Sequence, residues 1–255
     1  MTAIENQFLN RLGQFISDFT LTDNQMVQLR KYYENLLEWN KVMNLTTITE
    51  EEDVYTKHFL DSFSLLTSVP RGTLSGDDLQ EGSSKPLKLI DVGTGAGFPG
   101  LPIAIAFPDV QVTLMDSLNK RIKFLEDTAE KLHLTNVICV HARAEELAHN
   151  KEYREQYDLV VSRAVANLST LSEYCLPFAK VGGRFIAYKA EKVTEELPAG
   201  NKAAEILGAK LTKEFSFYLP ETDYHRTVLT YTKTKTTAKK YPRKAGTPGK
   251  EPLGI

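Results

Sequence analysis

From residue 87 onward, short apolar runs alternate with segments of helical periodicity, and this alternation constrains the fold more than any other feature of the sequence. The apolar runs are residues 87–92, 111–115, 137–141, 157–162 and 183–188. The helical segments between them are residues 100–107, 119–134, 145–153 and 167–179. This order is typical of right-handed βαβ units, which build a parallel sheet with helices on both faces. We therefore expect an α/β fold with a mostly parallel sheet.

The segment that follows predicts a change of strand direction. After a further helix near residues 192–208, two β-patterned runs at 210–219 and 224–232 are separated only by the turn sequence PETD. A connection this short joins antiparallel strands. We expect an antiparallel C-terminal hairpin at the edge of the sheet.

Residues 1–70 show helical periodicity only, which predicts a small N-terminal helical subdomain. Its apolar stripes are Phe8, Leu12, Phe15 and Phe19, then Met26, Leu29, Tyr33, Leu36 and Leu37. Thr22 with Gln25 matches a capping box, and a third helix is expected from Thr49 to about Ser68. Residues 71–86 are rich in Gly, Ser and Asp, which predicts a linker. The domains that result are 1–70, 87–234 and a C-terminal tail, 235–255.

Charge and cysteine content narrow the class of protein. Residues 233–255 hold seven Lys or Arg against one Glu, a charge of +6, so the rest of a chain of net charge −2 must carry −8. We find no signal peptide and no apolar run long enough to span a membrane, so we expect no membrane partner. Neither Cys139 nor Cys175 belongs to a CxxC pair. We expect reduced cysteines and a cytoplasmic protein.

The first strand of the α/β region runs into a glycine-rich loop, LIDVGTGAGFPGLP at residues 89–102. Residues 95–100 match G-x-G-x-x-G, and this loop is the expected cofactor site of a doubly wound sheet. A dinucleotide would place its phosphates on free amides at the start of the next helix. Pro99 and Pro102 lack that donor, and Asp91 would repel a phosphate. Asp91 instead suits a ligand with an ammonium and a sulfonium, which indicates S-adenosylmethionine.

A second acidic residue supports a nucleoside ligand. Asp116 ends the second predicted strand, where a carboxylate can accept hydrogen bonds from both ribose hydroxyls of an adenosine. An alternative is that Asp116 caps the helix beginning near Leu118. NAD carries the same ribose, so an NAD-linked oxidoreductase stays open at this point. From the residues we expect cofactor contacts at Asp91, Gly95, Gly97 and Asp116.

The remaining sequence restricts the methyl-transfer chemistry. Transfer to an exocyclic amine typically uses an Asn/Asp-Pro-Pro-aromatic loop after the fourth strand, where this chain reads SRAVAN at residues 162–167. Attack on a pyrimidine carbon needs a cysteine nucleophile, and both cysteines lie within predicted strand or helix. Guanine N7 already presents its lone pair, so in-line attack needs positioning and no base. The absence of an acid/base constellation therefore favours guanine N7.

Five motifs together resemble one known family. They are DVGTGAGFPGLPIAI, SRAVANL, WNKVMNLTTI, HFLDS and KKYPRKAGTPGKEPL. The chain is similar over residues 39–62 and 87–255 to the glucose-inhibited division protein B family (RsmG). The resemblance implies a Rossmann-like S-adenosylmethionine-dependent methyltransferase fold and methylation of guanine N7 in 16S ribosomal RNA. It also implies cofactor contacts at Gly93, Phe98, Ala144, Glu145 and Arg163.

These residues have structural alternatives. Phe98 would also serve helix–sheet packing, and Glu145 would be favoured by a helix dipole. Arg163, at the end of a central strand, requires a planar or anionic partner, so it is our candidate for positioning cofactor or target; no acid or base is assigned. His58 and Asp61 share a helix face as two potential metal ligands without a third, so we expect a local polar contact and no metal.

The basic tail is the expected RNA contact, because an acidic body cannot by itself attract a polyanion. The predicted RNA-binding residues are Lys189, Arg226, Lys239, Lys240, Arg243 and Lys244. The alternative for the tail is a disordered solubilising terminus. The expected partner is 16S rRNA, within the small ribosomal subunit or a precursor, and we expect a monomer. A non-catalytic nucleotide-binding regulator on the same fold is a further alternative.

Overall fold

The computed structural model describes residues 1–17, 19–69, 71–75, 86–190 and 193–255. Within the expected linker, Arg71–Ser75 form a short helix, α4, whose Leu74 is buried in the hydrophobic core. The expected linker therefore begins with a short helix, and residues 76–85 lie outside the described residues. None of the described helices has both the length and the apolarity needed to cross a membrane.

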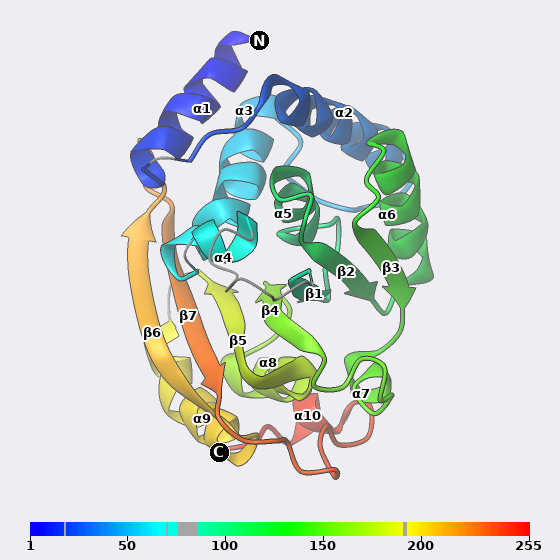
Figure 1. The fold of residues 1–255 in the computed structure, drawn as a ribbon, viewed down its shortest axis with the longest axis vertical. Helices are drawn as coiled ribbons and strands as arrows, with labels where there is room; N and C mark the ends of the chain where they lie inside the picture. The colour runs from blue at the N-terminus through cyan, green and yellow to red at the C-terminus, as the bar shows by residue number, and fades with distance from the viewer. Residues whose placement is uncertain (18, 70, 76–85, 191–192) are drawn as a thin grey trace.

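In the described part of the chain, seven strands form one sheet in the order β3-β2-β1-β4-β5-β7-β6 (Figure 1). The strands are β1 Lys88–Val92, β2 Gln111–Asp116, β3 Val137–His141, β4 Tyr157–Arg163, β5 Ala179–Lys189, β6 Ala209–Tyr218 and β7 His225–Lys233. Strands β1 to β5 are parallel, and β7 runs antiparallel to both β5 and β6. The expected α/β fold with a C-terminal antiparallel hairpin is confirmed.

Successive side chains along each strand point to opposite faces of the sheet, and two hydrophobic layers result, one on each face. Leu89 and Val161 face the layer built with α1, α2, α5 and α6, whereas Ile90 and Val160 face α7, α8 and α9. The helices are α1 Ala3–Phe15, α2 Asp23–Asn40, α5 Gly100–Ala106, α6 Asn119–Lys131, α7 Ala144–Leu147, α8 Leu168–Cys175, continued by a 3-10 turn Leu176–Phe178, and α9 Val193–Ile206. Both faces of the sheet are thus covered, as buried parallel strands require.

The N-terminal helices share one core with the sheet, so the proposed domain division stays a prediction. The Thr22–Gln25 capping box is confirmed at the start of α2. The apolar stripe of α2 is displaced from the predicted one: Tyr32 is fully buried, whereas Tyr33 is only half-buried. The displacement arises because α2 packs against the glycine-rich loop, where Tyr32 donates a hydrogen bond to the carbonyl of Ala96.

The expected third helix is a succession of three forms. An α-helical turn, α3 (Glu51–Val54), leads into a π-helix, η1 (Tyr55–Leu60), and then into a 3-10 helix, η2 (Phe63–Thr67). π-Helical turns occur often at functional sites. Here the segment carries His58 and ends beside Asp61, and it brings both side chains to the carboxyl end of β4.

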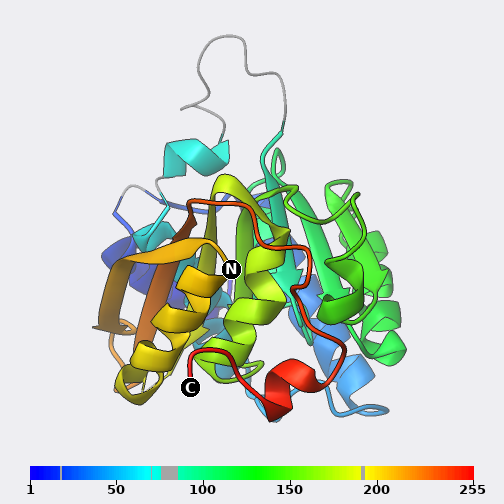
Figure 2. The same cartoon turned by 90° about the horizontal axis from the view of Figure 1, so that it is seen from below.

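The C-terminal tail is packed against the body rather than free (Figure 2). Arg154 donates hydrogen bonds to the carbonyls of Thr237 and Tyr241. Arg243 forms an ion pair of 2.7 Å with Glu173, whose side chain is fully buried. The tail also contains a short helix, α10 (Thr247–Lys250), which lies against α8. The alternative of a disordered terminus is therefore wrong.

Candidate active site

The carboxyl ends of β1, β2 and β4 open into a cavity of about 480 Å³. Strands β1 and β4 are neighbours at the point where the strand order reverses, which is where open α/β sheets bind ligands. The lining residues argued from below are Gly93, Gly95, Phe98, Asp116, Arg121 and Arg163. The structure thus brings together most of the cofactor residues predicted from the sequence.

The glycine-rich loop needs its glycines for backbone geometry. Gly93 has φ +73°, and a Cβ on it would lie 2.7 Å from the side chain of Val165. Gly97 has φ +95°, and a Cβ there would lie 2.5 Å from Leu101. Residues with side chains rarely adopt such φ values. The loop therefore requires glycine at both positions, and Gly93 and Gly95 line the cavity without side chains.

Asp91 lies behind this loop rather than in the cavity. Its Oδ2 accepts hydrogen bonds from the Thr94 hydroxyl (2.7 Å) and from the Gly100 amide (2.9 Å) at the start of α5. The amide that a pyrophosphate would use is therefore already occupied by a carboxylate. Burial raises the pKa of Asp91 to about 6, and Oδ1 has no hydrogen-bond partner among the described residues. Such a loop favours a cationic ligand over an anionic one.

Asp116 makes the contact at the start of α6 that was considered for it, while its contact with a ribose stays a prediction. The buried carboxylate lines the cavity, as expected of a residue that binds a ribose. Its Oδ1 accepts a hydrogen bond from the Leu118 amide (2.9 Å) at the start of α6. Its Oδ2 accepts from the Gly95 amide (3.0 Å) and from Arg121 Nη1 (3.1 Å). Arg121 lines the same cavity, so its contact with Asp116 lies beside the cavity.

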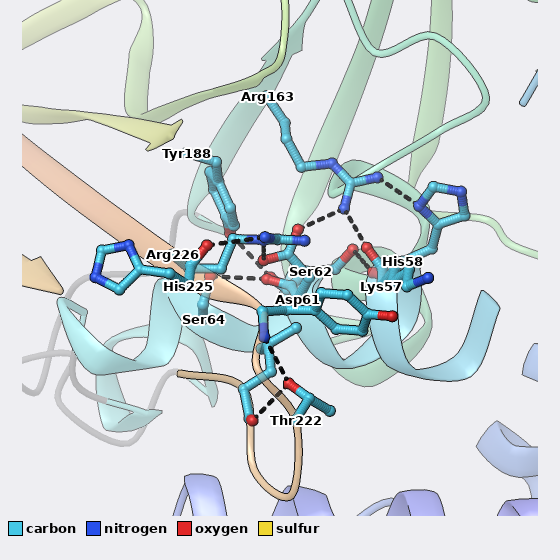
Figure 3. Close-up of polar contacts among 12 residues, drawn as sticks. Lys57, His58, Asp61, Ser62, Ser64, Arg163, Tyr188, Thr222, His225 and Arg226 are labelled. Atoms are coloured by element: carbon cyan, nitrogen blue, oxygen red, sulfur yellow. Dashed lines mark hydrogen bonds and ion pairs between the residues drawn. The ribbon is translucent and has the colours of Figure 1, made fainter. Parts of the chain in front are cut away.

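Arg163 is held by three partners from the N-terminal segment (Figure 3). Its Nη1 donates to Asp61 Oδ2 (2.7 Å) and to the Lys57 carbonyl (3.0 Å), and its Nη2 donates to His58 Nδ1 (3.0 Å). The guanidinium also lies over the Phe98 ring, 5.2 Å from the centroid. Arg163 thus has the anionic and planar partners that its position demanded.

Asp61 joins two arginines. It is buried, and its Oδ1 accepts from Arg226 Nε at 3.0 Å while its Oδ2 binds Arg163. Arg226, predicted to contact RNA, is therefore part of the same cluster at the mouth of the site. This arrangement brings η1, β4 and β7 together through one carboxylate.

His58 is neutral in this cluster, and its tautomer follows from its neighbours. A guanidinium can only donate, so His58 Nδ1 is the acceptor and Nε2 carries the hydrogen, which it donates to Thr46 Oγ1 (3.0 Å). Burial, together with the charge of Arg163, lowers the pKa of His58 to about 3. The ring also stacks on Phe98, with centroids 4.3 Å apart. His58 is therefore a fixed acceptor and not a general base.

Two further cavities adjoin the first. One of about 460 Å³ shares His58, Arg163 and Ala164 with it and extends to Tyr188, Lys189, Glu196 and Arg226. The other, of about 180 Å³, shares Gly93, Ser117 and Val165 and holds the predicted cofactor residues Ala144 and Glu145. The three cavities form one row, with the glycine-rich loop and Arg163 at its centre.

The predicted RNA-binding residues are less concentrated than expected. Lys239, Lys240 and Lys244 are exposed on the tail, whereas Arg243 is engaged with the buried Glu173. Lys189 pairs with Glu196 at 2.7 Å in the wall of the second cavity. Sequence reasoning missed the contribution of Glu196, Tyr32 and the Asp61 bridge, because hydrophobic periodicity carries no information on contacts between distant polar side chains.

Neither cysteine lines these cavities. Burial raises the pKa of Cys139 to about 12, and burial also raises the pKa of Cys175 well above its ordinary value. Both thiols are therefore protonated and are unsuited to covalent attack on a pyrimidine. Among the described residues, we find no cluster of three or more His, Cys, Asp or Glu side chains arranged to hold a metal ion.

The family model GidB, described as rRNA small subunit methyltransferase G, matches residues 25–221. The chain belongs to this family. Ribosomal RNA small subunit methyltransferase G of Ligilactobacillus salivarius is 53% identical over 234 residues, which cover 91% of this chain and 93% of that relative. The relative of the same name from Exiguobacterium sibiricum is 48% identical over 250 residues, covering 98% and 99%.

The GidB family assignment agrees with the fold. The solved structure of the antibiotic-resistance methyltransferase Kmr has a TM-score of 0.50 and 17% sequence identity, and the match covers 61% of this chain and 90% of that one. At this identity the likeness concerns the fold alone. Membership of the GidB family confirms the expected class, an S-adenosylmethionine-dependent rRNA methyltransferase, and neither the NAD-linked oxidoreductase nor the non-catalytic regulator is favoured.

Proposed function

We propose that this GidB-family protein methylates N7 of one guanine in 16S rRNA, within the small ribosomal subunit or a precursor. The observation that carries the proposal is the meeting of two cavities at Arg163, where the one neighbouring imidazole, His58, is a fixed acceptor. Transfer to an exocyclic amine requires proton removal, whereas guanine N7 does not. The absence of a basic imidazole at this point, among the described residues, fits the N7 reaction.

The residues present fit an S-adenosylmethionine donor, which supplies an electrophilic methyl group on a sulfonium. Gly93 and Gly95 line the cavity without side chains, and Asp116 offers acceptors for a ribose. Ala144 and Glu145 stand at the far end of the row, where a nucleobase would lie. The Arg163 guanidinium has hydrogen-bond donors and no acceptor, so its role is to orient the donor and the acceptor base.

The test is methylation of small ribosomal subunits from cells that lack this enzyme. We expect the protein with S-adenosylmethionine to create one site of aniline-induced strand cleavage, the signature of 7-methylguanine. Arg163→Lys should lower the rate roughly 10- to 150-fold, because lysine cannot serve Asp61, His58 and the Lys57 carbonyl together. Arg184→Lys, on the neighbouring strand β5, is the control. Subunits left uncleaved by aniline after treatment with the unaltered protein would refute the proposal.

The same proposal covers the setting of the reaction. We propose that the enzyme acts in the cytoplasm as a metal-free monomer. Light scattering should give one chain per particle, and a chelator should leave the methylation rate unchanged. A rate that falls on chelation and recovers with a divalent cation would contradict the metal-free part.

A further inference from the structure

An ion pair in the second cavity presents a donor beside an acceptor. Lys189, at the end of β5, and Glu196, in the first turns of α9, are 2.7 Å apart and both line the cavity of about 460 Å³. Their side chains are 12% and 28% exposed, respectively, so the pair is neither a free surface bridge nor a sealed core contact.

Both side chains are fixed by backbone groups. Glu196 Oε2 also accepts from the Leu168 amide (2.6 Å), and Lys189 Nζ also donates to the Ala166 carbonyl (3.2 Å). Within the described residues, this leaves Glu196 Oε1 without a partner and one N–H of the ammonium unused. The cavity wall therefore offers one anionic acceptor and one cationic donor in a fixed order.

We propose that Lys189 and Glu196 read the Watson–Crick edge of the target base, with the Lys189 ammonium donating to O6 and Glu196 Oε1 accepting from N1–H and the N2 amine of guanine. The inference rests on the proposed function, since it takes the base to enter this cavity. It moves Lys189 from a phosphate contact to a base contact and adds Glu196, which sequence reasoning did not identify.

The order of the two groups selects among bases. Adenine and cytosine present an amine where guanine has O6, so the amine would face the Lys189 ammonium, donor against donor. They also present a lone pair where guanine has N1–H, so the lone pair would face the Glu196 carboxylate, acceptor against acceptor. Uracil matches the pair at O4 and N3–H, but its O2 opposes the carboxylate where guanine has the N2 amine, and it has no N7 to receive a methyl group. With the Watson–Crick edge on this pair, the Hoogsteen edge of guanine is free to face Arg163 and the first cavity, which share one boundary.

Glu196→Gln is the sharpest variant, because it keeps size and changes one atom in the cavity. The amide oxygen still accepts from the Leu168 amide, while the amide nitrogen replaces Oε1 and meets the guanine donors. We expect kcat on small subunits to fall roughly 10- to 150-fold, the usual effect of losing a charged hydrogen bond. KM should change little, because phosphate contacts dominate RNA affinity.

Two controls isolate base recognition from folding. Glu195→Gln alters the exposed neighbour on the same helix and should retain full kcat. Calorimetric titration of the Glu196→Gln variant with S-adenosylhomocysteine should give unchanged stoichiometry and affinity, which shows that the donor site is intact. Lys189→Met, which removes the donor and keeps the aliphatic stem, should lower kcat by a similar factor.

The outcomes separate this inference from the proposed function. If the unaltered protein methylates subunits and Glu196→Gln retains its kcat, base reading by the pair is refuted and the proposed function stands. If kcat falls only in proportion to lost S-adenosylhomocysteine binding, the pair is structural and the inference also fails. If the unaltered protein produces no 7-methylguanine, the proposed function itself fails.

Discussion

At the scale of single residues, Asp116 joins the glycine-rich loop to α6 through one carboxylate. Asp116→Asn keeps one acceptor oxygen and places the side-chain amide NH2 against the backbone N–H of Gly95 or Leu118. We expect the affinity for S-adenosylhomocysteine to fall by about 1–3 kcal/mol, the cost of a buried group left unsatisfied. Calorimetry measures the affinity, with Asp109→Asn, an exposed residue just before β2, as the control. Equal affinities for the two variants would contradict the assignment of Asp116 to the cofactor site.

His58 makes the folded state sensitive to acid. Because burial and Arg163 lower its pKa from 6.5 to about 3, the folded state binds fewer protons than the unfolded state between those values. Stability is therefore lost as the pH falls below about 6.5. Between about pH 7 and pH 5, the unaltered protein should lose about 2 kcal/mol more of its unfolding free energy than His58→Gln.

Denaturant titrations at the two pH values measure this difference. The control is His133→Asn, because His133 is exposed and asparagine tolerates its left-handed backbone. That variant should show the full pH dependence of the unaltered protein. An identical pH dependence in His58→Gln would show that His58 is not the group responsible.

At the scale of elements, helix α2 supports the donor loop through Tyr32. This side chain is fully buried, donates to the Ala96 carbonyl and stacks with Phe98 at 5.2 Å. Tyr32→Phe leaves that carbonyl unsatisfied, so we expect weaker S-adenosylhomocysteine binding by roughly 1–3 kcal/mol. Tyr33→Phe removes a hydroxyl that bonds the Thr49 carbonyl instead, and it should leave donor binding unchanged. Calorimetry on both variants tests whether support of the loop is specific to Tyr32.

Some of the helices and strands could be predicted from the sequence, and others could not. The strands were predictable because short apolar runs between helical segments mark them locally, and the capping box at Thr22 is equally local. The third helix was not, because a change from α to π and 3-10 geometry leaves no trace in periodicity. The demand of Arg163 for an anionic partner was foreseen, whereas its identity, Asp61, depends on a contact across 102 residues of chain.

At the scale of the whole molecule, the tail combines internal packing with exposed charge. Removing it would leave the buried Glu173 without its only ion-pair partner in the described chain and would take the buried Tyr241 out of the hydrophobic core, so truncation would destabilise the fold. Truncation would therefore mix any loss of RNA binding with a loss of stability. The RNA-binding role of the tail is better tested by changing the exposed lysines alone.

The double variant Lys239→Gln with Lys240→Gln should retain its melting temperature and weaken subunit binding. We expect the slope of log K against log salt to become shallower by about 1.5, or roughly 0.7–0.9 per lost phosphate contact. Lys202→Gln with Lys210→Gln, also exposed, provides a control of equal charge change. Filter binding over a salt series measures the slope for each double variant. Equal slopes for the two would show that Lys239 and Lys240 do not contact RNA phosphates.

The two shielded thiols have a practical consequence for probing the complex. Burial raises the pKa of both Cys139 and Cys175, so both remain thiols near neutral pH. The thiolate is the form that attacks an alkylating reagent, so neither cysteine should react readily. A cysteine placed at Lys240, which is exposed, would therefore be labelled selectively in the otherwise native sequence. A photo-crosslinker attached at that position would mark the rRNA strand that passes the tail, and moving it along the exposed lysines would trace the strand's path.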